Sequence, residues 1–129
     1  MSFNDYGIGT HTCGEAVVAC RRVSLNSSDA LVYADADKTG IGVTRNPQDN
    51  GEDVGVAYIN KPGTHEICAA GAFSIGDKVY AAADGKVQAI PTAAGTYYQV
   101  GLAMEAATAD GDLVEILIHE LGTAVTVSE

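Results

Sequence analysis

The fold is decided by residues 78–90, which read KVYAAADGKVQAI. Two short apolar segments, residues 78–83 and 86–90, flank the dipeptide Asp84-Gly85. Asp-Gly readily adopts the two positive φ angles of a tight type I′ turn, and this turn joins neighbouring antiparallel strands. The stretch therefore predicts a β-hairpin that turns at Asp84 and Gly85.

Short apolar runs separated by turn residues extend over most of the chain. Clusters rich in Asn, Asp, Gly and Pro mark turns and loops, and they fall at residues 27–29, 46–51, 61–63 and 110–112. Breaks at such intervals leave little room for long helices. A length of 129 residues is about one domain's worth. We therefore expect residues 15–129 to form a single all-β domain with little helix.

The first 14 residues have a different character. Phe3, Tyr6 and Ile8 lie there among three glycines and the polar residues Asn4 and Asp5. Such a segment seldom packs as a regular element on its own. We expect residues 1–14 to be a flexible N-terminal arm that orders when it meets a partner. A frayed terminus is the alternative.

Two parts of the chain match each other imperfectly. Residues 42–44 (GVT) precede an acidic turn, and residues 101–103 (GLA), 59 positions later, precede another. Upstream, residues 32–34 and 79–81 both read VYA, at a spacing of 47 positions. The two spacings predict a twelve-residue insertion in the second copy, around residues 91–99. Two such copies would close one barrel or sandwich around a shared core.

One strand of this match is ambiguous. In this match the alternating apolar residues of segment 54–58 align with Leu113, Glu115 and Leu117. The alignment therefore places a charged residue, Glu115, opposite an apolar one. Either the register is one residue off, or the strand turns its other face to the core. That other face is equally apolar and consists of Val114, Ile116 and Ile118. Because a strand that is apolar on both faces is typical of one covered twice, we predict that this face contacts a second subunit.

The charge of the chain excludes two classes of partner. Seven Lys and Arg against 17 Asp and Glu give a net charge of -10, which repels nucleic acid and anionic membranes alike. Arg21-Arg22 is the only adjacent basic pair and is too small for a nucleic-acid patch; contact with an acidic partner is the alternative. The chain has neither the ~20-residue apolar run of a membrane helix nor the start of a signal peptide. We therefore expect it to be made in, and to stay in, a cytosol-like compartment until it assembles.

No motif in the chain predicts catalysis or a cofactor. Phosphate-binding loops and nucleophile elbows are both missing from the sequence. The three cysteines are irregularly spaced and lack the spacing of zinc modules, so we interpret them as buried small hydrophobes. The zinc alternative would use His11, Cys13, Cys20 and either His65 or Cys68. The acidic residues 49–53 match no EF-hand loop, and we interpret them as solvated turn residues with no bound metal.

Several segments, taken in order, resemble the capsid-cement family of tailed phages. The segments are residues 72–80, 82–87, 95–97, 100–107 and 111–116, with residues 32–34 and 42–43 in the first copy. The resemblance spans about residues 16–120. It implies a compact β domain of the tulip or small-barrel kind, with no enzymatic activity.

The resemblance also implies a role and partners. The protein would be made in the host cytoplasm, bind the major capsid protein on the outer surface of the assembled phage head, and clamp adjacent capsid subunits. It would associate with itself, with a homotrimer as the first expectation and a dimer as the alternative. By position, an N-terminal capsid-binding arm that adds a strand to a capsid loop would use Phe3, Asn4, Asp5, Tyr6, Ile8 and His11.

A second hypothesis comes from a different class of protein. A β module on the virion that binds carbohydrate or a host surface would use Tyr97 and Tyr98 as a stacking platform. Tyrosines in such a sequence are more often half-buried strand residues.

Overall fold

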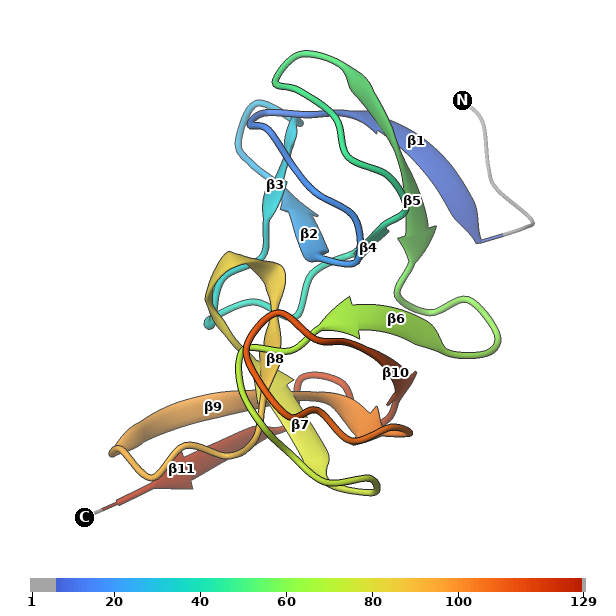
Figure 1. The fold of residues 1–129 in the computed structure, drawn as a ribbon. Coiled ribbons are helices and arrows are strands. Elements are labelled where there is room, and N and C mark those ends of the chain that lie inside the picture. Colours follow the sequence, from blue (N-terminus) through green and yellow to red (C-terminus); the bar gives the residue numbers. More distant parts are fainter. Residues whose placement is uncertain (1–6, 129) are drawn as a thin grey trace.

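The computed structural model describes residues 7–128 and shows an all-β protein built from two antiparallel sheets. Figure 1 shows the first sheet at one end of the molecule and the second at the other. Between residues 7 and 128 the only helix is a single 3-10 turn, η1 (Ala83–Gly85). None of the helices in that range is long and apolar enough to span a membrane. The prediction of an all-β fold with little helix is confirmed.

The two sheets have different strands, but arrange them in the same order along the chain and across the sheet. The first sheet has the order β1-β5-β4-β2-β3 and comprises β1 (Ile8–Thr12), β2 (Arg22–Leu25), β3 (Leu31–Tyr33), β4 (Gly42–Thr44) and β5 (Asp53–Tyr58). The second has the order β6-β10-β9-β7-β8 and comprises β6 (His65–Cys68), β7 (Lys78–Ala81), β8 (Val87–Gln88), β9 (Gly95–Ala103) and β10 (Leu113–Ile118). An extra strand, β11 (Ala124–Val127), pairs with β9. Adding five to each strand number of the first sheet gives the second, so the predicted repeat is confirmed.

The strand pairing corrects the register of the repeat. Val23 pairs with Gly42 as Val79 pairs with Gly101, so β2 corresponds to β7, and Val79 is not the counterpart of Val32. Equivalent residues of the two copies are therefore 56 positions apart for strands β1, β2 and β3, and 59 positions apart for β4. The insertion in the second copy is thus three residues and not twelve. The VYA match at residues 32 and 79 was misleading because valine and tyrosine are common in strands, so a match of three residues recurs readily by chance.

The ambiguous strand is resolved as a register error of one residue. Thr44 pairs with Val56, and the equivalent Ala103 pairs with Ile116, so β5 corresponds to β10 at a spacing of 60 positions. In this register buried Val56 matches buried Ile116. The strand keeps the same face toward the core in both copies.

The predicted hairpin is confirmed in its turn and in its pairing. Asp84 and Gly85 have φ values of 58° and 75°, and the amide of Lys86 donates to the carbonyl of Ala83 at 3.3 Å. These features define a type I′ turn. The strands pair through Tyr80 with Gln88 and through Ala81 with Val87.

The prediction of a barrel is wrong for the described residues. In each half a single isolated β-bridge links the two opposite edges of the sheet. The bridge joins Cys13 and Leu31 in the first half, and Ala69 and Val87 in the second. No ladder of paired strands closes either half between residues 7 and 128. Within the described residues, strand pairing is completed inside each of the two sheets, and no strand of one sheet pairs with a strand of the other.

The core crosses the boundary between the two sheets. A small cluster around Val23, Leu31 and Val54 lies within the first half and includes Cys13 as a buried small hydrophobe. A larger cluster in the second half also contains Val43 and Ile59 from the first. Burial of each such Val or Ile contributes about 1.5–3 kcal/mol. The shared cluster makes the two halves one folded body.

Candidate functional site

The two halves are joined at a buried arginine. Arg22, in β2, has no solvent exposure, and burial lowers the pKa of its guanidinium to about 10, so it remains charged at neutral pH. All its hydrogen bonds go to backbone carbonyls. In the first half the acceptors are Ala34 (3.2 Å) and Lys38 (2.5 Å), and in the second they are Ala82 (2.7 Å) and Lys86 (2.8 and 3.0 Å).

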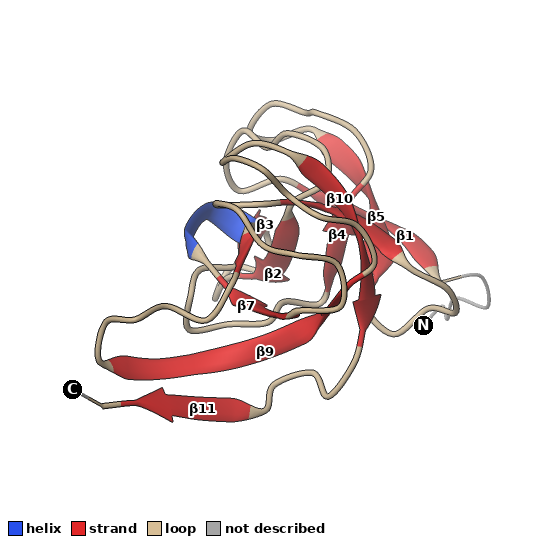
Figure 2. Cartoon of the chain, turned by 60° about the horizontal axis from the view of Figure 1, so that its bottom comes forward, coloured by secondary structure: helices blue, strands red, loops and turns tan. Residues whose placement is uncertain are grey.

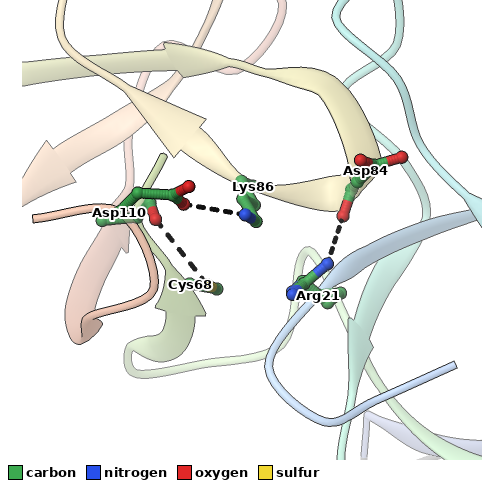
Figure 3. Close-up of polar contacts among 6 residues, drawn as sticks. Arg21, Cys68, Asp84, Lys86 and Asp110 are labelled. Carbon is green, nitrogen blue, oxygen red and sulfur yellow. Dashed lines mark hydrogen bonds and ion pairs between the residues drawn. The ribbon is translucent and has the colours of Figure 1, made fainter. Parts of the chain in front are cut away.

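Neighbouring contacts fix the same junction (Figure 3). Arg21 donates from Nη1 to the carbonyl of Asp84 at 3.0 Å and lies over the ring of Tyr33 at 5.4 Å. Lys86 Nζ lies 2.7 Å from Asp110 Oδ1, which ties the hairpin turn to the loop before β10. Both arginines therefore donate across the junction, and Arg22, being fully buried, is not available to an acidic partner.

A polar hollow of about 270 Å³ lies between the halves and shows no catalytic arrangement. Its lining includes Cys20, Lys61, His65 and Glu66. The Cys20 thiol donates to Glu66 Oε1 at 3.3 Å, and burial together with that carboxylate raises the pKa of Cys20 to about 11. Burial lowers the pKa of His65, with Lys61 adding to the effect. A thiol whose pKa is raised so far is a poor nucleophile.

The residues of the zinc alternative do not form a metal centre. All three cysteines are free. Within residues 7–128, no three His, Cys, Asp or Glu side chains lie close enough together to hold a metal ion. His11 instead hydrogen-bonds through Nε2 to the Tyr58 hydroxyl at 2.8 Å.

The structure moves the start of the folded domain toward the N-terminus. Ile8 and His11, which were assigned to the flexible arm, lie in β1, and β1 pairs with β5 from Ile8–Ala57 to Thr12–Asp53. The boundary at residue 15 is therefore wrong, because residues 8–12 already form a strand of the first sheet. The other arm residues, Phe3, Asn4, Asp5 and Tyr6, lie outside the described residues.

Gly9 permits β1 to pack against β5. A Cβ built at Gly9 would lie 2.1 Å from the Tyr58 hydroxyl oxygen. We expect Gly9→Ala to displace the tyrosine, break its hydrogen bond to His11 and cost about 1–2 kcal/mol of unfolding free energy. Urea denaturation measures the loss, and hydrogen exchange should show faster exchange in β1. Gly71→Ala is the control because a Cβ there meets nothing within 4 Å; equal losses in the two variants would contradict this account.

The predicted subunit interface lies in the core of the protein. Val114 and Ile116 are 2% and 0% exposed, and Ile118 packs against the same cluster. The side chains of Val114 and Ile116 face the interior of the second half and are not available to a partner, and Ile118 is half-buried beside them. The opposite face of β10 carries exposed Leu113 and Glu115.

The tyrosines of the carbohydrate hypothesis do not share a surface. Tyr97 and Tyr98 are consecutive residues of β9, so their side chains point to opposite faces of the strand. Both are half-buried, and the Tyr97 hydroxyl donates to the carbonyl of Ala93 at 2.7 Å. The pair therefore does not make a single stacking platform.

Comparison with known families gives a match that covers most of the chain. The family model of the phage cement protein matches residues 6–118. The chain belongs to the phage cement protein family. This is a family of structural proteins, so the protein is not an enzyme, and it is a structural component of the phage head. A search of curated protein sequences gives no match.

A solved structure shows the same fold as this cement protein. The base of the head fiber protein gp8.5 from bacteriophage phi29 is similar with a TM-score of 0.72. The similarity covers 90% of this chain and 96% of that chain, with 19% sequence identity. At this identity the likeness concerns the fold.

Proposed function

We propose that this protein binds the outer surface of the assembled phage head and stabilises it by clamping neighbouring capsid subunits. Its partner is the major capsid protein, and its copies associate as a homotrimer after synthesis in the host cytoplasm. The observation that carries the proposal is the cement family match over residues 6–118. The fold shared with the phi29 head fiber base, a head-associated protein, also supports it.

The junction between the halves suits a clamp. A protein that binds only assembled subunits stabilises the assembly by its binding free energy, and no chemistry is required. Such a clamp must resist being pulled apart. Arg22 bonds to carbonyls in both halves, and the larger core cluster contains residues of both. The net charge of -10 keeps an outward-facing protein soluble.

The N-terminal segment is the proposed capsid contact. β1 is an outer strand of the first sheet, and Gly7 separates it from residues 1–6. In this proposal Phe3, Asn4, Asp5, Tyr6, Ile8 and His11 contact the capsid, with β1 or the segment before it adding a strand to a capsid loop.

The proposal is tested with expanded, undecorated heads of the phage that encodes the protein. We expect saturable co-sedimentation, and we expect decorated heads to withstand higher temperature and chelator concentration than bare ones. A variant without residues 1–6 keeps β1 intact and should bind about tenfold or more weakly, as expected when a hydrophobic anchor is lost. If the full chain does not co-sediment, the clamp is wrong; binding to a glycan array would then favour the carbohydrate module. Equal binding by the shortened variant would remove the arm from the proposal.

A further inference from the structure

The second sheet departs from the first at one place. β9 has nine residues where the equivalent β4 has three, and β11 has no counterpart in the first sheet. Figure 2 shows the additional part of β9 and β11 extending together away from the rest of the molecule. We call residues 95–98 and 124–127 the ribbon. A feature present in only one of two matching halves needs its own explanation.

The ribbon is a pair of strands with unpaired outer edges. It is held by the pairs Tyr98–Ala124, Tyr97–Val125, Thr96–Thr126 and Gly95–Val127. β7 and β10 pair with β9 only from Gln99 onward. Within residues 7–128, β11 has no strand partner other than β9. An isolated two-stranded ribbon is marginally stable in water, so extension of this one away from the body suggests further support.

The ribbon also lies in the least charged part of the protein. Residues 87–104 and 121–128 contain no charged side chain, although the chain carries 7 basic and 17 acidic residues. Natural proteins usually protect free sheet edges with lysine, proline or a bulge, and residues 95–98 and 124–127 contain neither lysine nor proline. One face of the ribbon carries Tyr97, Val125 and Val127, which are all half-buried. Exposed Ile90 (43%) and Leu121 (38%) lie in the segments that lead to its two strands.

We propose that the ribbon is the self-association site of this protein and that a second copy occupies it. Two copies, each with a net charge of -10, repel one another over most of their surfaces. The uncharged ribbon is where they can approach without that repulsion, and its free edges supply backbone donors and acceptors for pairing between copies. The contact replaces the interface predicted on β10. This inference rests on the proposed function, because it locates the contact between copies in the proposed homotrimer.

The test adds like charges to the ribbon and measures mass in solution. Ala124 and Thr126 are exposed, and the double variant Ala124→Glu with Thr126→Glu should weaken self-association roughly hundredfold, because like charges are then juxtaposed across the contact. The control variant Ser27→Glu with Ser28→Glu adds the same charge at two exposed residues of the first half, outside the ribbon. Light scattering over a concentration series gives the mass, and circular dichroism with thermal unfolding shows that both variants fold.

Salt provides a second readout. A contact between uncharged surfaces of two acidic copies should strengthen as salt screens their repulsion, whereas a contact made by ion pairs weakens. A wild-type chain that stays monomeric up to its solubility limit would overturn the proposal, and so would a ribbon variant that associates like the control. Both measurements are made without heads, so failure of the self-contact is distinct from failure to bind the capsid.

Discussion

Replacing Arg22 with methionine is expected to lower the free energy of unfolding by about 3–5 kcal/mol, because several buried hydrogen bonds from a charged donor are lost together. Methionine is similar in length but donates no hydrogen bond, so the carbonyls of Lys38 and Ala82 would lose the donor that Arg22 supplies, whereas the carbonyl of Lys86 would keep the Ala82 amide. Each buried acceptor left without a partner costs about 1–3 kcal/mol. Because a domain is stable by only about 5–15 kcal/mol, the variant should be close to unfolding at 37 °C.

Urea denaturation followed by circular dichroism measures this loss. Arg45→Met is the matched control, since Arg45 is exposed on the same half, and it should change stability by less than about 0.5 kcal/mol. Arg22→Lys keeps the charge but replaces the planar five-donor group with a three-donor point charge, and we expect an intermediate loss. An Arg22→Met variant as stable as the control would show that the junction does not depend on this side chain.

Arg22 also shows where prediction from the sequence fails. The β-hairpin at Asp84-Gly85 was predictable because its signal is local: two adjacent residues provide the positive φ angles. The burial of Arg22 has no local signal. Its acceptors are backbone carbonyls up to 64 positions away, and any residue can supply a carbonyl. A basic pair in an acidic chain therefore indicated a surface contact when one of the two arginines was fully buried.

The repeat and the candidate surfaces show the same limit. The two copies were detectable from residues 42–44 and 101–103, but their register depends on the pairing of Val23 with Gly42 and of Val79 with Gly101, which only the sheets reveal. The apolar face of β10 was recognised correctly, but whether a core or a partner covers such a face depends on packing. The ribbon was missed because the absence of charge over residues 87–104 is not a motif. It becomes informative once β9 and β11 are seen to leave the body of the protein.

Replacing Gly101 with alanine is expected to cost about 3 kcal/mol or more, at the upper end of what overpacking costs. Gly101 lies in the middle of the second sheet, between Val79 of β7 and Ile118 of β10. A Cβ at Gly101 would lie 2.0 Å from the carbonyl oxygen of Leu117. That atom is backbone, so relief requires β10 to move away from β9 and disturbs the core behind it.

The duplicated fold provides an internal comparison for this prediction. Gly42 occupies the equivalent place in the first sheet, where a Cβ would lie 2.6 Å from the carbonyl oxygen of Ala57. We expect unfolding free energies to fall in the order Gly71→Ala, Gly42→Ala, Gly101→Ala, with Gly71 open to solvent on its Cβ side. Urea denaturation of the three variants checks this order. A Gly42→Ala variant less stable than Gly101→Ala would mean that the halves differ in how tightly their sheets pack. The expected order implies that both glycines recur because, at this one position of each sheet, the neighbouring strand's backbone lies too close to leave room for a side chain.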